Sequence, residues 1–143
     1  MKTTMLAALA CAALVAAGCG GGGGGELSKK ALAKKANAIC TKFSKEGEKL
    51  GSPDLSNPGK AADYFDKATA LAHKQQDELE ALKPASDVKA DYGKLTKATG
   101  EATKLLGDLA DAAKAKDQKK GVELIQKLTP ISSQVDEAAK AVD

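Results

Sequence analysis

The sequence predicts an all-α protein folded as an antiparallel up-down-up-down four-helix bundle. Ala, Lys, Leu, Glu and Asp dominate the 143 residues, and all of them except Asp favour helices. No segment alternates apolar and polar residues as a half-buried strand does. Behind residue 25, apolar residues recur every three or four positions in four stretches. The connections between these stretches are short, which makes consecutive helices antiparallel neighbours.

The first predicted helix covers residues 26–50 and ends at Gly51, since Gly is a common stop signal. The second begins at Asn57, a capping residue followed by Pro58 at the first helical position. It closes before Pro84, which disfavours helical geometry in the residue preceding it. The residues expected to face the core are Leu32, Ala36, Ile39, Phe43 and Leu50 in the first helix, and Ala61, Phe65, Ala68, Ala72, Gln75, Leu79 and Leu82 in the second.

The third predicted helix covers residues 86–115, and the fourth follows a short turn at Lys116-Asp117. Steps of four and three alternate along the third helix, as in a supercoiled bundle seam. Pro130 lies inside the fourth helix, where it removes one backbone hydrogen bond and predicts a kink. The core stripes are Val88, Tyr92, Leu95, Thr99, Ala102, Leu106, Leu109 and Ala113, and then Ile125, Leu128, Ser132, Val135, Ala139 and Val142, widened by Leu124 and Ile131. Together the four helices define a domain over residues 26–143.

The chain begins with the features of a secretory signal. Lys2 supplies positive charge, and an apolar run of 13 residues follows from Met5 to Ala17. This run is too short to span a bilayer, which takes roughly 20 residues, and it fits the apolar core of a signal peptide. It ends in Ala16-Ala17-Gly18-Cys19, which resembles the lipobox of bacterial lipoproteins, although such boxes favour Leu where this chain has Ala16.

That resemblance implies removal of residues 1–18 as a lipoprotein signal peptide. Cys19 then carries a diacylglyceryl thioether, with fatty acyl chains such as palmitate, and anchors the protein in the cell membrane on the extracytoplasmic side. Two acyl chains make a stable anchor, whereas one chain binds only marginally. Residues 19–25 form a Gly-rich tether with a coil reach of about 15 Å.

The segment Ala36-Asn37-Ala38-Ile39-Cys40 adds to this likeness. With the lipobox, the Gly run and the Ala/Lys-rich helices, it makes the chain similar to small helical envelope lipoproteins of high-GC Gram-positive bacteria. The resemblance implies a second Cys near the C-terminus that could bridge to the first, but this chain reaches Asp143 without one. Cys40 is therefore interpreted as a small buried hydrophobe, as half of an intermolecular disulfide, or as a free thiol.

Composition argues against several classes of function. The chain has no Arg and only four aromatic residues, which argues against nucleic-acid binding. His73 is the only histidine, and no spacing of Cys, His or carboxylates matches a metal, haem or other cofactor site. No nucleophile elbow or phosphate-binding loop is present. We therefore expect a protein without metal or cofactor that is not an enzyme. A thiol enzyme using Cys40 and His73 is an alternative, because antiparallel packing of the first two helices places these two residues at a similar height along the bundle.

Two surface features invite a functional interpretation. Gly93, Gly100 and Gly107 recur every seven residues, although each helical Gly costs up to about 1 kcal/mol relative to Ala. They indicate either close approach of a neighbouring helix or a groove that accepts a partner helix or extended ligand. A cluster of lysines follows the tether, either as a solvated face or as a face toward lipid headgroups. Its members are Lys29, Lys30, Lys34 and Lys35.

The sequence thus predicts a membrane-anchored envelope lipoprotein whose helical domain binds or interacts with other molecules without catalysis. Its expected partners are the membrane, through the lipid anchor, and a protein of the envelope. A small-ligand carrier that uses the bundle interior or the Gly flank of the third helix is the alternative. The Cys40 and His73 thiol enzyme is the second alternative.

Overall fold

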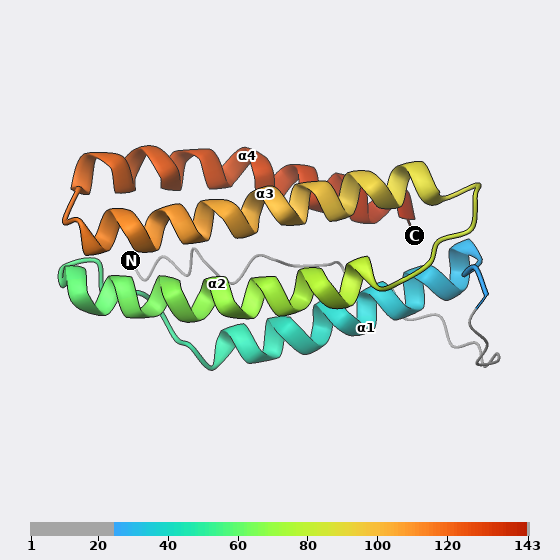
Figure 1. Ribbon diagram of the computed structural model, residues 1–143, viewed down its shortest axis with the longest axis horizontal. Helices are drawn as coiled ribbons and strands as arrows, with labels where there is room; N and C mark the ends of the chain where they lie inside the picture. The colour runs from blue at the N-terminus through green and yellow to red at the C-terminus, as the bar shows by residue number, and fades with distance from the viewer. Residues whose placement is uncertain (1–24, 143) are drawn as a thin grey trace.

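The computed structural model describes residues 25–142, which form four α-helices (Figure 1). Each helix runs antiparallel to the one before it, so the predicted all-α, up-down-up-down bundle is confirmed. Within these residues the only β pairing is an isolated bridge between Leu27 and Pro84. The helices are α1 (Lys29–Glu48), α2 (Pro58–Glu80), α3 (Lys89–Lys114) and α4 (Gln118–Val142). Their ends lie within three residues of those predicted from sequence.

Local sequence accounts for several of these ends. The Asn57 side chain accepts a hydrogen bond from the backbone N–H of Lys60 at 3.2 Å, which caps α2. Asp117 caps α4 in the same way, accepting from the backbone N–H of Lys120 at 2.9 Å. The turn before α4 depends on Lys116, whose φ of 56° is unusual for a residue with a side chain.

The start of the domain is fixed to the connection between α2 and α3. The N–H of Leu27 donates to the carbonyl of Lys83 at 2.7 Å, and the N–H of Ala85 donates to the carbonyl of Leu27 at 2.9 Å. Leu27 also packs against the apolar core of this end. The chain preceding α1 therefore leaves the fold at the end of the bundle where α1 begins and α2 finishes.

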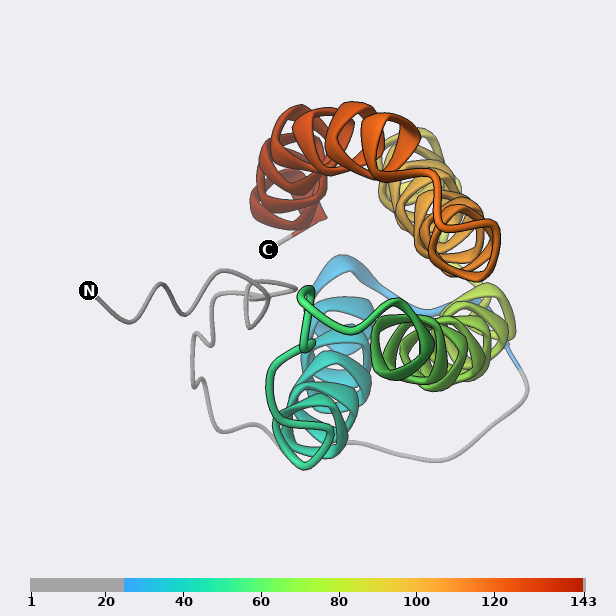
Figure 2. The same cartoon turned by 90° about the vertical axis from the view of Figure 1, so that its left-hand side faces the viewer.

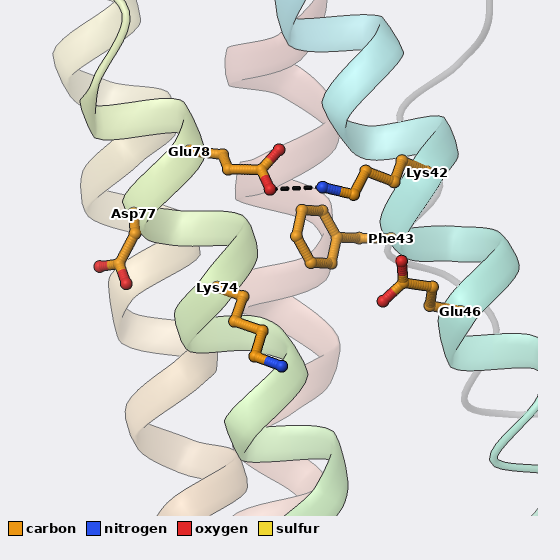
Figure 3. Close-up of a pocket in the computed structure, with 6 residues that line it drawn as sticks. All are labelled: Lys42, Phe43, Glu46, Lys74, Asp77 and Glu78. Atoms are coloured by element: carbon orange, nitrogen blue, oxygen red, sulfur yellow. Dashed lines mark hydrogen bonds and ion pairs between the residues drawn. The ribbon is translucent and has the colours of Figure 1, made fainter.

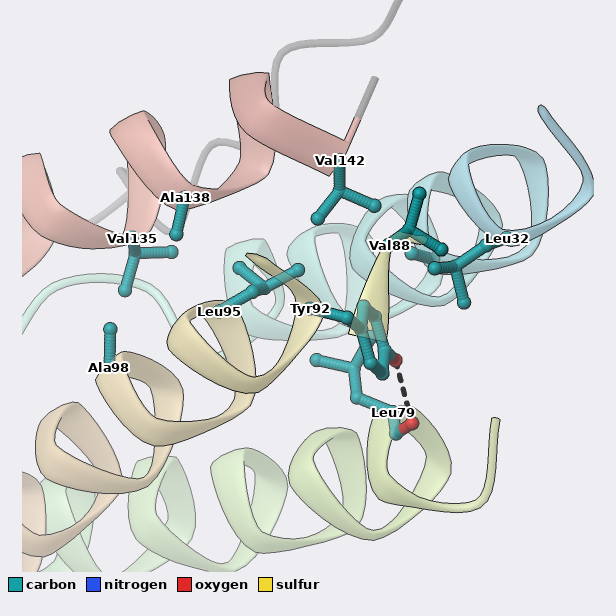
Figure 4. Packing of buried hydrophobic residues seen from close by; sticks show 10 residues of the cluster. Leu32, Leu79, Val88, Tyr92, Leu95, Ala98, Val135, Ala138 and Val142 are labelled. Carbon is teal, nitrogen blue, oxygen red and sulfur yellow. Dashed lines mark hydrogen bonds between the residues drawn. The ribbon is translucent and has the colours of Figure 1, made fainter. Parts of the chain in front are cut away.

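The core is divided into two clusters of buried apolar residues. The four-helix cluster receives residues from all four helices and from the α2–α3 connection (Figure 4): Leu32, Ala36, Leu79, Val88, Tyr92, Leu95, Ala98, Val135, Ala138 and Val142. The three-helix cluster at the other end receives none from α1: Ala61, Phe65, Ala72, Leu105, Leu106, Leu109, Ala110, Ala112 and Leu124. The bundle is thus closed by α1 only at one end.

The position of α1 explains this division. α2 packs on α3, and α3 on α4, along most of their lengths, whereas α1 packs mainly on α2 and meets α4 only briefly. Figure 1 shows α1 ending beside the middle of α2, and Figure 2 shows α1 and α2 on one side of the molecule with α3 and α4 on the other. The outer side of α1 therefore faces away from α3 and α4.

Buried polar side chains lie between the two clusters. The hydroxyl of Thr99 donates to the Leu95 carbonyl, and that of Thr103 donates to the Thr99 carbonyl, each at 2.9 Å. The amide of Gln75 lies 3.7 Å from the sulfur of Cys40. No buried side-chain nitrogen or oxygen in the described part of the chain lacks a hydrogen-bond partner. The polar layer is therefore satisfied, as buried polar groups in stable folds generally are.

One predicted core position is wrong: Ile125 is 36% exposed, and the neighbouring Leu124 is the residue buried in that turn of α4. In α1, Leu32, Ala36 and Phe43 are buried as predicted. Cys40 is buried with them, and Ile39 is half-buried and packs against the four-helix cluster. Leu124 packs in the three-helix cluster with residues of α2 and α3. Because α1 adds no residue to this cluster, no fourth helix covers the adjacent Ile125. α4 continues through Pro130, whose side chain is exposed.

Tyr92 makes the stability of the fold sensitive to alkaline pH. Its hydroxyl donates to the Leu79 carbonyl at 2.6 Å, and burial, with a smaller contribution from the charge of Glu80, raises its pKa far above the usual value (Figure 4). The unfolded chain releases this proton near pH 10, and the folded chain holds it to higher pH. The free energy of unfolding should therefore fall above about pH 10, by up to about 1.4 kcal/mol per pH unit.

Denaturant unfolding at a series of pH values, on the protein and on Tyr92→Phe, tests this expectation. Tyr92→Phe should cost about 0.5–1.5 kcal/mol at neutral pH through the lost hydrogen bond. Above pH 10 it should also have a shallower slope than the unchanged protein. Tyr64→Phe is the comparison: burial raises the pKa of Tyr64 less than that of Tyr92, so this variant should reduce the slope less. An unchanged slope for Tyr92→Phe would contradict the assignment.

Candidate functional site

The outer side of α1 carries the most uneven charge distribution of the molecule. Residues 27–45 contain six lysines and no carboxylate, and acidic residues appear only in the last turn of α1, at Glu46 and Glu48. The inward side of the same helix is buried. We define the lysine face as the exposed lysines of α1 and its C-cap other than Lys29 and Lys42, which lie near carboxylates of α3 and α2: Lys30, Lys34, Lys35, Lys45 and Lys49.

The rest of the chain balances its charges. Residues 26–49 contain seven lysines and three glutamates, whereas residues 50–143 contain fourteen lysines and sixteen carboxylates. Ion pairs outside α1 include Lys94 with Asp91 at 2.6 Å and Lys104 with Asp108 at 2.7 Å. Among residues 25–142, no carboxylate lies within 4 Å of the side-chain nitrogens of Lys30, Lys35, Lys45 and Lys49. The net positive charge of the domain is therefore concentrated on α1.

The structure revises the lysine cluster predicted from sequence. Lys30, Lys34 and Lys35 lie on the lysine face as expected. Lys29 is not part of it, because this first residue of α1 lies near Asp91 of α3. The hydrogen bond from Lys94, and more weakly the charge of Lys29, lower the pKa of Asp91. Lys45 and Lys49 were not predicted from the sequence. The lack of acidic residues up to Lys45 and the spacing of four between these two lysines were the signals available.

A shallow depression lies between α1 and α2 (Figure 3). Lys42 on α1 forms an ion pair with Glu78 on α2, and its side-chain nitrogen sits 4.7 Å from the centre of the Phe43 ring. Both partners of the ion pair remain about half exposed. The residues that line the depression are Lys42, Phe43, Glu46, Lys74, Asp77 and Glu78. The charges here compensate one another across the two helices, which suits a contact that holds α1 on α2.

The structure does not bring Cys40 and His73 together. Cys40 is 2% exposed, and the α2 side chain that reaches its sulfur is Gln75, at 3.7 Å. His73 lies on the exposed side of α2. Residues two positions apart lie about 200° apart around a helix, so Gln75 and His73 point to different sides. The geometry required for a Cys–His pair, proposed as an alternative from sequence, is therefore absent.

The Cys40 sulfur is also disulfide-bonded, which removes it as a nucleophile. Cys40 is the only cysteine among the described residues, so the other half of the bond lies outside them. Within the chain, the sequence offers Cys11 and Cys19 as partners. A sulfur cannot carry both a disulfide and a lipid thioether, so a disulfide between Cys19 and Cys40 would exclude the lipid anchor.

The glycine flank of α3 lies along the edge of α2. A Cβ placed on Gly100 would lie 3.1 Å from the Gln76 side-chain nitrogen, and one on Gly107 would lie 3.7 Å from the Thr69 methyl group. A Cβ on Gly93 would meet nothing within 4 Å. Thr69 and Gln76 are seven residues apart, like the glycines, so the next position in this series falls beyond the end of α2. Two of the three glycines therefore adjoin a helix of this chain.

The glycine flank gives a matched pair of stability predictions. Gly93→Ala should raise the free energy of unfolding by about 0.5–1 kcal/mol, because Ala favours the helix and the space is open. Gly100→Ala should gain less, because the Gln76 side chain must shift by a few tenths of an ångström, which weakens its 2.7 Å hydrogen bond to Glu80, a pair worth about 0.2–0.5 kcal/mol. Urea unfolding of both variants measures the difference. A larger gain for Gly100→Ala would show that Gln76 is not held against this flank.

Two other features of a functional site are absent from residues 25–142. No group of three or more His, Cys, Asp or Glu residues there has the arrangement needed to hold a metal ion. None of the four helices is both long and apolar enough to span a membrane. The predicted signal peptide, Cys19 and the predicted tether up to residue 24 lie outside the described residues. The chain matches no protein-family model, no curated protein and no solved structure.

Proposed function

We propose that the protein is an envelope lipoprotein, anchored by acyl chains on Cys19, whose helical bundle is a non-enzymatic interaction domain on the extracytoplasmic side of the membrane. The observation that carries this proposal is the junction Ala16-Ala17-Gly18-Cys19 at the end of an apolar run of 13 residues. The uninterrupted glycines from Gly20 to Gly25 add to it, because a lipid-anchored domain needs a flexible tether.

The start of the folded domain supports this arrangement. Among the described residues, Leu27 is the first with backbone hydrogen bonds to another part of the fold, and it follows the Gly run by only two positions. A Gly run at this position in the chain suits a spacer between the anchor and the bundle. The exposed surfaces described above carry lysines, ion pairs and glycines, which suit recognition of a partner.

Metabolic labelling with a fatty-acid probe tests the anchor. The unchanged protein should take up the probe and sediment with membranes, and Cys19→Ala should lose the label and remain unprocessed or leave the membrane fraction. Cys11→Ala is the matched control, since it removes a cysteine from the same segment without touching the lipobox. Label that persists on Cys19→Ala would place the anchor elsewhere or disprove it.

A further inference from the structure

The lysine face breaks a local rule of helix design. The N-terminal end of a helix carries partial positive charge, so acidic residues near it are stabilising and cations near it are not. The first turn of α1 contains no acidic residue and includes Lys29 and Lys30. Four lysines of the face have no carboxylate near them within the described residues. Local violations of this kind tend to mark functional surfaces, because folding alone does not require them.

The position of the tether places this face close to a membrane. Cys19 and Leu27 are eight residues apart, so their separation is at most about 29 Å when extended and about 15 Å as a coil. The tether joins the bundle where α1 begins, and α1 itself is about 30 Å long. A bundle held at this distance can lay the whole of α1 along the surface that carries its anchor.

The chemistry of the face suits lipid headgroups. Its charges are all lysine ammonium groups, which act as point charges and need no bidentate geometry. Each lysine near an anionic membrane surface favours binding by roughly fivefold. The tether also keeps the local concentration of headgroups high, so that individually weak contacts add to the anchor. A nucleic acid would lack this proximity, and the chain has no Arg for phosphate recognition.

We propose that the lysine face of α1 binds the anionic headgroups of the membrane that holds the lipid anchor. This inference rests on the proposed function. The bundle then lies along the surface on its α1 side. Because α3 and α4 lie on the other side of the molecule, they face away from the membrane and are the helices presented to a partner (Figure 2).

Lysine footprinting of the mature lipoprotein in vesicles tests the orientation. The protein is reconstituted into vesicles of phosphatidylcholine alone and of phosphatidylcholine mixed with phosphatidylglycerol, and then treated briefly with an amine-acetylating reagent. Acetylation of Lys30, Lys35 and Lys45 should be at least about threefold slower in the anionic vesicles, a conservative limit given the attraction per lysine. Lys97 on α3 and Lys127 on α4 should react equally in both. High salt should remove the protection by screening.

Two variants separate the lysine face from general positive charge. The first variant combines Lys30→Gln, Lys34→Gln and Lys35→Gln. Acetylation is then read at the two unchanged lysines of the face, Lys45 and Lys49, and their protection should be lost. The control combines Lys97→Gln, Lys119→Gln and Lys127→Gln, which removes the same charge from exposed positions on α3 and α4. This control should keep the protection on α1.

The outcomes distinguish the two proposals. A protein that fails to float with either kind of vesicle would contradict the lipid anchor itself. A protein that floats with both but shows equal acetylation of α1 in both would overturn the membrane-binding role of the lysine face. Protection of Lys97 and Lys127 in place of α1 would overturn it as well, since the opposite side would then face the lipid.

Discussion

Leu79→Ala in α2 is expected to lower the free energy of unfolding of residues 26–143 by about 2–5 kcal/mol. Leu79 is 1% exposed and packs within the four-helix cluster. Its carbonyl also accepts the hydrogen bond of Tyr92, so a shift of this turn disturbs a second contact. The substitution leaves a cavity at the end of the bundle where all four helices meet, and this is the end where α1 is attached.

Urea unfolding followed by circular dichroism gives the free energy, and hydrogen exchange shows where the fold loosens. Exchange in α1 should rise beyond the global change, because the four-helix cluster holds this helix to the bundle. Leu55→Ala is the control, as Leu55 is 58% exposed and should change stability by no more than about 0.5 kcal/mol. A loss below 1 kcal/mol for Leu79→Ala would mean that the four-helix cluster does not carry the stability assigned to it.

Phe65→Ala is expected to cost about 3–5 kcal/mol at the opposite end of the molecule. Phe65 is 3% exposed in the three-helix cluster, and the Tyr64 ring meets its ring edge-on at 5.5 Å between centres. α1 contributes nothing to this cluster. The loss should therefore loosen α2, α3 and α4 near this end without an added increase of exchange in α1.

The same unfolding and exchange measurements check Phe65→Ala. Val122→Ala on α4 is its control, because Val122 is 56% exposed near the same end of the bundle. If Phe65→Ala raised exchange in α1 as strongly as Leu79→Ala, the core would behave as one unit, and its division into two clusters would have no energetic meaning.

Helix type, order and ends were predictable because the local signals agree. Asn57 and Pro58 start α2, Gly51 follows α1, and the repeat of four and three along α3 matches its buried face. The depth of each position in the core was less predictable. α4 carries two overlapping apolar stripes, one containing Leu124 and one containing Ile125, and periodicity does not specify which faces α3.

The short reach of α1 had no clear sequence signal. Its apolar stripe jumps seven residues from Phe43 to Leu50, and Leu50 lies in the turn after the helix, half-buried. The Cys–His alternative depended on which residues of α2 face Cys40. Cys40, placed beside the stripe in sequence, is buried with it and meets Gln75, whereas His73 lies on the exposed side of α2. The spacing of apolar residues did not specify this pairing across the two helices.

Part of the candidate site followed from the sequence and part required the fold. The cluster of lysines just after the tether is visible in the chain, and three of its four members, Lys30, Lys34 and Lys35, lie on the lysine face. The inclusion of Lys45 and Lys49 depended on which side of α1 is buried. The proximity of Gly100 and Gly107 to α2 depended on the pairing of two helices, which glycines recurring every seven residues do not specify.

The central claim is that Cys19 carries the lipid anchor, and the mass of the N-terminal peptide tests it most directly. Protein extracted from membranes without reduction is digested, and the peptides containing Cys19 and Cys40 are identified by mass spectrometry. The account predicts a chain that begins at Cys19, with a diacylglyceryl group on its sulfur. A chain that begins elsewhere with an unmodified Cys19, or a peptide in which Cys19 is disulfide-linked to Cys40, would contradict it.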